Sequence, residues 1–468
     1  MTERDTEVLV VGGGPGGYTA AIRVGQLGCD VTLVERNAYG GTCLNAGCIP
    51  SKALITVANR VHEVRNGDRM GIEADVDLDF GTMMDWKDDV VSSMSRSVEK
   101  LCRANRVSLL EGRAEFVDDH TARIVDENGS EVERTTFDHA IIATGSRPIE
   151  LPEFEFDRPA VLDAGQALEL QTLPDQLVVV GAGYIGMELS TMFAKLGVEV
   201  TVLEALDTML QGFPANLVAP VDGRVTELGI DVHCGERATA CETTDKGITV
   251  RTESDDGTVT EYPADAVLVA VGRQPVADTV APEQVGLELD DRGFIRTDEH
   301  CRTARDHIFA VGDVAGEPML AHAGSAEAEV AAERIAGRAA SMNNRAIPAV
   351  AFTDPEIATV GLSAEEARDT AIDVSVGEFP MRASGRALTT GHTDGFVRLV
   401  ADEDGTVLGG QAVGPEASEL VAEIGLAVER GLTVTDLTET VHAHPTLAEA
   451  IREAAANVED RAIHTLNR

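Results

Sequence analysis

The sequence predicts an α/β fold with two Rossmann-like dinucleotide-binding domains and a C-terminal α+β domain. Two observations predict the first part: a glycine-rich pattern of strand, turn, helix and strand occurs at residues 8–35 and again at 177–204. A third predicts the last domain, since alternating strands followed by helices fill the chain from about residue 346. The length of 468 residues is enough for about three domains of ~100–200 residues.

The composition is that of a folded and strongly acidic protein. Hydrophobic residues make up 43%, which is close to the average for globular proteins. The 80 acidic residues against 38 Lys and Arg give a formal charge of −42, which repels nucleic acid and anionic membranes. The charge predicts a salt-rich cytoplasm that screens it, the alternative being an acidic mesophilic protein. We expect no membrane partner, since no apolar run approaches the ~20 residues of a membrane span.

The first glycine-rich pattern has the residues of a nucleotide site. Residues 8–35 read VLVVGGGPGGYTAAIRVGQLGCDVTLVE, with the key glycines at Gly12, Gly14 and Gly17. Glycine is needed where the turn is tight, where the backbone approaches a pyrophosphate and where the helix packs on the strand. Glu35 ends the second strand, where a carboxylate accepts hydrogen bonds from a ribose.

The second pattern repeats the first at the same spacing. Residues 177–204 read LVVVGAGYIGMELSTMFAKLGVEVTVLE, with Gly181, Gly183 and Gly186 followed by Glu204. One such pattern alone could be a loop that only packs a helix on a strand. Two complete copies with an acid at the same offset favour two dinucleotide sites.

Three further apolar strands end at a glycine or an acid. HAIIATGSRP (139–148) breaks at Gly145, and AVLVAVGRQP (266–275) has the same design. HIFAVGDV (307–314) places Asp313 just past a strand. Open α/β sheets bind ligands at the carboxyl ends of their strands, so Asp313 suits a ligand hydroxyl, with an ordinary turn residue as the alternative.

The C-terminal region predicts a subunit interface. Residues 396–414 read as two alternating strands joined by a turn, and two helical stretches follow at 418–431 and 445–463. Its apolar alternation is more than a small monomeric domain needs.

The segment GGTCLNAGCIPSK (40–52) predicts a redox-active dithiol. Cys43 and Cys48 lie near a helix start and beside Lys52, and this positive potential favours a thiolate. Pro50 should distort that helix and let the two sulfurs meet. The alternative is two unconnected core cysteines. The other five cysteines are isolated, which predicts neither a disulfide framework nor a metal site.

The chain resembles the FAD-dependent pyridine-nucleotide disulfide oxidoreductases nearly end to end. The resemblance rests on the motifs above and on ATG at 143–145, GD at 312–313 and HAHPTLAEA at 442–450. The resemblance is strongest to an acidic, haloarchaeal form of those members that oxidise dihydrolipoamide. It implies an FAD-binding domain at 1–150, an NAD-binding domain at 151–275, a central domain at 276–345 and a dimerisation domain at 346–468.

The resemblance also implies roles for individual residues. Cys48 would lie next to the flavin, and Cys43 would exchange with the substrate. The remaining catalytic residues would be Lys52 near the flavin with Glu188 as its partner, and His444 as the base with Glu449 orienting it. An imidazole suits the transfer of a thiol proton near neutral pH, and a carboxylate partner fixes its tautomer.

Contacts to the two cofactors follow from the same resemblance. For FAD they are Gly12, Gly14, Gly17, Glu35, Gly41, Thr42, Lys52, Ala114, Thr144, Gly145, Asp313 and Ala321. For NAD they are Gly181, Gly183, Gly186, Glu204, Gly272 and Arg273. No arginine follows Glu204 closely, which favours NAD over NADP, although Tyr184 also occurs in NADPH-using relatives.

The partners implied are a second copy of the chain and the lipoyl domain of a 2-oxoacid dehydrogenase acyltransferase. The implied reaction is the oxidation of protein-bound dihydrolipoamide to lipoamide, with NAD as acceptor. The alternative is another FAD-dependent reductase, acting on a glutathione-like or bis-γ-glutamylcystine disulfide. A flavin-loaded but catalytically silent component is disfavoured, because the residues implied in catalysis are all present.

Overall fold

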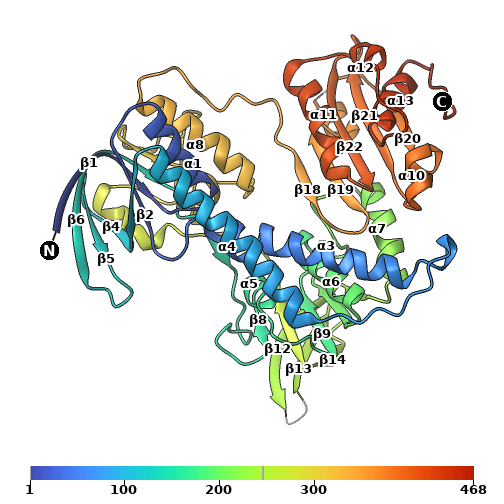
Figure 1. Ribbon diagram of the computed structural model, residues 1–468, viewed down its shortest axis with the longest axis horizontal. Helices are drawn as coiled ribbons and strands as arrows, with labels where there is room; N and C mark the ends of the chain where they lie inside the picture. Colours follow the sequence, from blue (N-terminus) through green and yellow to red (C-terminus); the bar gives the residue numbers. More distant parts are fainter. Residues whose placement is uncertain (1, 245–246, 371, 468) are drawn as a thin grey trace. The chain divides into compact units, whose positions relative to one another are not determined.

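The computed structural model describes residues 2–244, 247–370 and 372–467, and the chain forms two compact units (Figure 1). The first unit comprises residues 1–151, 162–173 and 271–343. The second comprises residues 152–161, 174–270 and 344–468. Within the described ranges, no helix combines the length and the apolar character needed to cross a membrane.

The first unit is built on a mixed sheet of order β3-β2-β1-β6-β5-β4, with β17 also paired to β6. Its strands are β1 (Thr2–Val11), β2 (Val31–Glu35), β3 (Val107–Glu111), β4 (Arg113–Asp118), β5 (Thr121–Val125), β6 (Glu131–Ile142) and β17 (Ile308–Ala310). β1 is parallel to β2 and to β6, with Val8 opposite Val31 and His139. All five residues of β2 are buried, as expected of a parallel strand covered on both faces.

Helices cover this sheet. Figure 1 shows α1 (Pro15–Gln26) beside α8 (Ala321–Ile335), two segments far apart in the sequence. Their buried faces carry small residues such as Ala20 and Ala328, which allow close approach. The unit also holds α2 (Gly41–Ala46), α3 (Cys48–Arg65), α4 (Phe80–Ala104), α5 (Ala164–Ala167) and the antiparallel pair β7 (Ser146–Pro148) and β16 (Arg273–Pro275).

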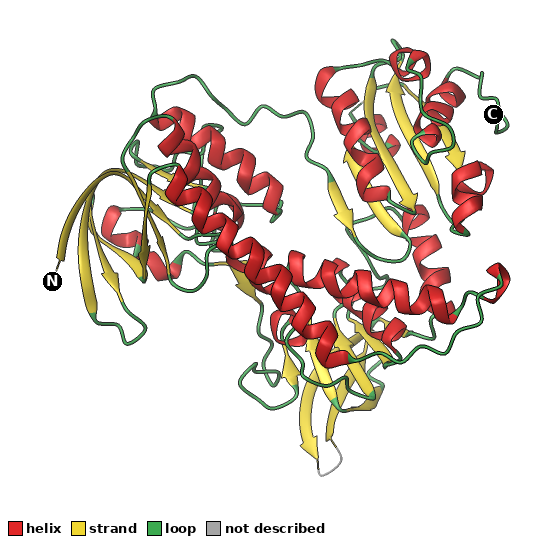
Figure 2. Cartoon of the chain, in the orientation of Figure 1, coloured by secondary structure: helices red, strands yellow, loops and turns green. Residues whose placement is uncertain are grey.

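The second unit contains three sheets, drawn yellow in Figure 2. The first has the order β11-β10-β9-β15-β8, with β8 (Val161–Leu162), β9 (Gln176–Val180), β10 (Glu199–Glu204), β11 (Asp231–Cys234) and β15 (Ala266–Val269). The second is β12 (Glu236–Thr244), β13 (Gly247–Ser254) and β14 (Val259–Ala264). Helices α6 (Tyr184–Leu196) and α7 (Ala215–Glu227) belong to this half of the unit.

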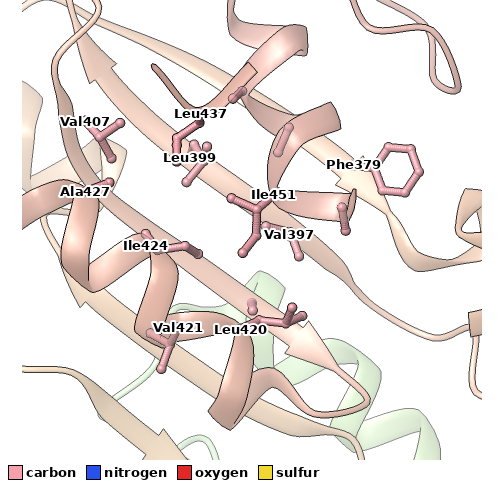
Figure 3. Packing of buried hydrophobic residues seen from close by; sticks show 14 of the residues in the cluster. Phe379, Val397, Leu399, Val407, Leu420, Val421, Ile424, Ala427, Leu437 and Ile451 are labelled. Atoms are coloured by element: carbon pink, nitrogen blue, oxygen red, sulfur yellow. The ribbon is translucent and has the colours of Figure 1, made fainter. Parts of the chain in front are cut away.

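The third sheet is antiparallel, with the order β18-β19-β22-β21-β20. Its strands are β18 (Ala349–Ala351), β19 (Glu356–Gly361), β20 (Val374–Pro380), β21 (Phe396–Asp402) and β22 (Val407–Gly414), and its helices are α9 (Ala364–Asp369), α10 (Gly385–Thr390), α11 (Ala417–Arg430), α12 (Val434–Glu439) and α13 (Glu449–Val458). Figure 3 shows the core between them, where Val397 and Leu399 of β21 lie among fully buried Ile424 and Ile451 from two helices. The two strands predicted over 396–414 are confirmed.

The last predicted helix is shorter than the sequence suggested. It forms over Glu449–Val458 only, and not over 445–463. Before it, the N–H of Thr446 donates to Glu449. After it, the N–H groups of Ile463 and His464 donate to Glu453, which lies back on the helix. The carboxylate of Glu453 therefore satisfies the N–H of Ile463, which a helix continuing to 463 would have paired internally.

Candidate active site

The first glycine loop, between β1 and α1, leaves no room for side chains. Gly12 has φ +103°, and a Cβ there would lie 2.3 Å from the carbonyl oxygen of Ala143. A Cβ on Gly17 would lie 1.7 Å from the carbonyl oxygen of Gly12. Gly41, at the start of α2, approaches the loop so closely that its Cβ would lie 2.5 Å from the Cα of Gly14. Such a bare backbone at a helix N-terminus fits the pyrophosphate of a dinucleotide.

Glu35 lies beside this loop at the end of β2. One carboxylate oxygen accepts from the N–H of Gly13 at 2.6 Å, and the other from the N–H of Asn37 at 2.8 Å. These bonds fix the carboxylate, and each oxygen has a second lone pair for a ribose hydroxyl. The arrangement fits the ribose of FAD.

Asp313 lies just past β17, and the sequence did not single out two of the residues around it, Ser146 and Glu327. The hydroxyl of Ser146 donates to Asp313, and Arg273 donates to Ser146. The N–H of Gly312 donates to Glu327 at 2.6 Å, and burial raises the pKa of Glu327. Ser146 directly follows the strand break at Gly145, and this position could have indicated a site residue. No motif in the sequence marks Glu327, which lies within α8.

The remaining residues expected at FAD also belong to the first unit. Thr144 donates its hydroxyl to the carbonyl oxygen of Val276 at 2.5 Å, and Gly145 has φ +71°. The others are Thr42 on α2, Lys52 on α3, Ala114 buried on β4, and Ala321 at the start of α8. Their contacts with FAD stay predictions.

The second glycine loop, between β9 and α6, repeats the geometry of the first. Gly181 has φ +105°, and a Cβ on Gly186 would lie 2.1 Å from the carbonyl oxygen of Gly181. Among the described residues, nothing lies within 4 Å of a Cβ built on Gly183, so the loop backbone is open to a ligand there. Glu204 accepts from the N–H of Ala182 at 2.7 Å. This arrangement fits the pyrophosphate and ribose of NAD.

The dithiol is formed across a break between two helices. Cys43 lies in α2, and Cys48 is the first residue of α3. The chain turns at Gly47, whereas Pro50 lies in the first turn of α3, where its missing N–H breaks no helix bond. The expected distortion is therefore at Gly47 and not at Pro50. A hydrogen bond with Cys48 and burial raise the pKa of the Cys43 thiol, while the charge of Lys52 lowers it.

The structure brings the predicted base and its partner together in the second unit. Nδ1 of His444 lies 3.0 Å from one oxygen of Glu449 and 3.2 Å from the other. Burial alone would raise the pKa of Glu449, but the N–H of Thr446 and the ring of His444 bring it below its usual range. Because a carboxylate only accepts, Nδ1 carries the ring proton and Nε2 keeps a lone pair. The ring is 78% exposed, so Nε2 can receive a proton from a ligand.

This pair lines a surface cavity of about 390 Å³. Other titratable residues lining it are Glu439, His442, Arg452, Glu453 and His464. His442 differs from His444 because its ring is only 6% exposed and bonds Glu423 at 2.9 Å. Of these two histidines, His444 is the one whose ring faces solvent.

Glu188 lies buried on α6 and accepts from the N–H of Phe352 at 2.7 Å. Its expected pairing with Lys52 stays a prediction. Gly272, with φ +126°, and Arg273 belong to the first unit, whereas the second glycine loop belongs to the second unit. Their contacts with NAD stay predictions as well.

Comparison with known proteins identifies the family. Residues 6–328 match the model of the pyridine nucleotide-disulphide oxidoreductases, and residues 347–455 match the dimerisation domain of the same proteins. The chain belongs to the pyridine nucleotide-disulphide oxidoreductase family. The expected cofactors, FAD and NAD, are those of this family and of its dihydrolipoyl dehydrogenases. The dimerisation domain supports a homodimer.

Relatives within the family cover nearly the whole chain. The dihydrolipoyl dehydrogenases of Halobacterium salinarum and Haloferax volcanii are each 56% identical, over 99% of this chain and 98% of theirs. That of Geobacillus stearothermophilus is 47% identical over the same shares. Two of the three come from haloarchaea, which fits the acidic composition.

Solved structures confirm the predicted fold class. LpdA from Mycobacterium tuberculosis superposes with a TM-score of 0.90 at 27% identity, covering 98% of this chain and 100% of that one. The flavoprotein disulfide reductase RclA from Escherichia coli gives 0.85 at 25% identity, covering 96% and 99%.

Proposed function

We propose that this chain is a dihydrolipoyl dehydrogenase, which oxidises dihydrolipoamide to lipoamide and reduces NAD to NADH. The observation that carries the proposal is 56% identity, over nearly the full length, to the dihydrolipoyl dehydrogenase of Halobacterium salinarum. The contact between Cys43 and Cys48 and the pairing of His444 with Glu449 support it, since these groups are the ones that thiol–disulfide exchange requires.

The first half of the reaction uses residues of this chain. Glu449 holds Nδ1 of His444, so Nε2 takes the proton of a substrate thiol. The substrate thiolate attacks Cys43, the bond between Cys43 and Cys48 breaks, and Cys48 leaves as a thiolate. The second substrate thiol then loses its proton to water, and its sulfur attacks the first substrate sulfur, closing the lipoyl ring. Cys43 leaves as a thiol with the proton that His444 held, and two electrons have passed from substrate to enzyme.

The cofactors supply the remaining redox chemistry. When bound, FAD would supply the two-electron chemistry that links the enzyme dithiol to NAD. The loop at Gly12 and the carboxylates of Glu35 and Asp313 would hold FAD. The loop at Gly181 and the carboxylate of Glu204 would hold NAD.

We also propose that each active site combines two subunits, with the dithiol of one chain facing His444 of the other. His444 lies within the dimerisation domain, and Val441 beside it is 94% exposed. Two more apolar side chains of the C-terminal segment, Ile463 and Leu466, are 75% and 81% exposed. A partner subunit would remove these apolar side chains from water.

Co-refolding two inactive chains tests the shared site. A Cys48→Ser homodimer and a His444→Ala homodimer should both be inactive, but a heterodimer has one site with both defects and one with neither. It should recover about half the activity of the wild-type dimer, because a two-fold dimer has two equivalent sites. No recovery in a purified, FAD-loaded heterodimer would show that dithiol and base belong to the same chain.

The physiological reductant we propose is dihydrolipoamide on the lipoyl domain of a 2-oxoacid dehydrogenase acyltransferase. The cavity beside His444 lies at the surface, where a tethered arm can reach it. An isolated lipoyl domain carrying reduced lipoamide should therefore be oxidised, whereas the same domain without its lipoyl group should give no NADH.

The two half-reactions test the role of the base. His444→Ala should lower dihydrolipoamide oxidation by about 10²-fold or more, as expected for a general base, while NADH-to-dye transfer through FAD continues. His442→Ala is the matched control, since that ring is bonded to Glu423, and it should retain most dihydrolipoamide oxidation. If His444→Ala abolishes both activities together, His444 is structural and the proton acceptor lies elsewhere.

A further inference from the structure

We propose that Arg273 is a positioning residue for the FAD site, acting on Asp313 through Ser146. The sequence places Arg273 among the residues that contact NAD. In the structure its guanidinium bonds Ser146 of the first unit, next to the carboxylate expected to bind FAD. The inference rests on FAD use by the chain and not on which disulfide the enzyme reduces or which dithiol it oxidises.

Arg273 holds Ser146 by two hydrogen bonds. Its Nε donates to the hydroxyl oxygen at 2.7 Å, and a terminal nitrogen donates to the carbonyl oxygen at 2.8 Å. A guanidinium has donors only, so the hydroxyl accepts from it and has its single proton left to donate elsewhere. That proton goes to Asp313. Arg273 therefore fixes the direction of the hydrogen bond that reaches the carboxylate.

The backbone around this chain of bonds is itself held in place. β7 and β16 form a short antiparallel pair in which Ser146 lies opposite Pro275. The N–H of Val276 donates to the carbonyl oxygen of Gly145 at 2.9 Å, and Thr144 donates to the carbonyl of Val276. Ser146 is buried, so water competes little for its hydroxyl.

Asp313 is also constrained from its backbone side. The N–H of Gly312 donates to Glu327, and the charge of Asp313 is one of the causes that raise the pKa of Glu327. Two carboxyl groups are thus neighbours, and the hydroxyl of Ser146, itself held by Arg273, donates to one of them, Asp313. With one oxygen of Asp313 accepting from Ser146, its second oxygen keeps a fixed direction toward a ligand hydroxyl. Loss of either donor lets the carboxylate rotate.

The inference is tested by measuring, through flavin fluorescence, the rate at which the intact, full-length enzyme releases FAD in molar KCl. Arg273→Met and Ser146→Ala should each release FAD about tenfold faster than wild type, as for the loss of one hydrogen bond to a charged group. The double variant should release FAD no faster than the faster single variant, because the two residues act in series. Ser146→Ala, at a residue outside the set expected to contact NAD, should keep the wild-type KM for NAD within about twofold.

Two control variants separate positioning from general damage. Arg147→Met removes the same charge one residue from Ser146, but Arg147 pairs with exposed Asp278 at 3.0 Å, so FAD release should match wild type. Ser146→Thr keeps the hydroxyl and should also retain FAD.

Three results would overturn the inference: additive losses in the double variant, faster release from Arg147→Met, or an Arg273→Met enzyme that keeps FAD but has a raised KM for NAD. Should Arg273→Met fail to fold, the comparison of FAD release from Ser146→Ala and from Ser146→Thr is the test. Equal release from these two variants would also overturn the inference. None of these outcomes depends on turnover of dihydrolipoamide, so they stay separate from the test of the proposed function.

Discussion

The two glycine loops share their internal geometry and differ in what surrounds them. In both loops, the first glycine has φ near +104°. A Cβ on the third glycine, Gly17 or Gly186, would overlap the carbonyl oxygen of the first. Glu35 and Glu204 both accept from a loop N–H and from the N–H two residues further on. The same sequence pattern has therefore folded into the same local structure twice.

The surroundings of the middle glycine separate the two sites. Gly14 is packed against Gly41, and Val311 and Gly324 lie against Gly16. Gly183, in contrast, has open space in front of it among the described residues, and Tyr184 next to it is 40% exposed. An enclosed site suits a cofactor that stays bound through many turnovers, and an open one suits a nucleotide that exchanges in each. We therefore expect each loop to form a dinucleotide site and its neighbours to set how long the ligand stays.

The largest expected effect comes from closing either loop with a methyl group. Gly17→Ala places a Cβ 1.7 Å from a carbonyl oxygen and should weaken FAD binding about 100-fold or more through this overlap. Gly186→Ala should instead leave the protein with full flavin absorbance and raise the KM for NAD by a similar factor. Gly223→Ala, inside α7 with nothing among the described residues within 4 Å of its Cβ, is the control for a methyl group added to a helix without overlap.

Loss of flavin from Gly186→Ala, or retention of both nucleotides by Gly17→Ala, would contradict the assignment of the two loops.

The next largest effect is expected from the carboxylates of Glu35 and Glu204, which end the second strand of each nucleotide motif. Glu204 leaves no favourable place for a 2′-phosphate, so NAD should be preferred over NADP by about tenfold or more in kcat/KM. Glu204→Gln should narrow this preference and leave FAD in place, whereas Glu35→Gln should loosen FAD and leave the preference unchanged. Equal kcat/KM for the two nucleotides with the wild-type enzyme would refute the assignment of NAD.

A smaller effect is expected at the dithiol of Cys43 and Cys48, which lies in the first unit. Lys52 lowers the pKa of the Cys43 thiol against the opposing effects of Cys48 and burial. Lys52→Met should therefore raise that pKa, and alkylation of the reduced enzyme at Cys43 should need a pH about one unit higher. Lys100→Met removes an exposed charge on α4 and should leave the alkylation profile unchanged. A shift to lower pH would contradict the charge effect of Lys52.

Salt should give the smallest difference between the sites. The formal charge of −42 repels the phosphates of an exchanging nucleotide, and molar KCl shortens the Debye length to about 3 Å. The KM for NAD should fall about threefold between 0.1 M and molar KCl while the FAD content stays constant, an order-of-magnitude expectation for a screened local field. The unfolding temperature should rise over the same range, and a flat or falling curve would contradict the halophilic interpretation.

Local patterns explain what the sequence could predict. Each glycine loop lies within a few residues of chain, so its spacing predicts it, whereas the pair of His444 and Glu449 was predicted from the resemblance to the family. The link from Arg273 to Ser146 spans 127 residues, and that from Ser146 to Asp313 spans 167, so no periodicity could have found it. These contacts depend on the pairing of β7 with β16, which only the folded chain sets.

The three-stranded sheet of β12, β13 and β14 was not predicted either. Its strands lie between the second nucleotide motif and the strand at 266–269, and they carry no residue with a recognisable role. Burial alternates along both strands, between partly buried and buried residues in β13 and between exposed and partly buried residues in β14, so the pattern was present without a motif to draw attention to it.

The most direct test of the proposed function is a steady-state comparison of substrates with the purified, FAD-loaded enzyme in molar KCl. We expect kcat/KM for dihydrolipoamide with NAD to exceed that for reduction of a glutathione-type disulfide, with either NADH or NADPH, by about 100-fold or more, as for a site shaped around its own substrate. Equal or faster reduction of the glutathione-type disulfide would contradict the assignment as a dihydrolipoyl dehydrogenase.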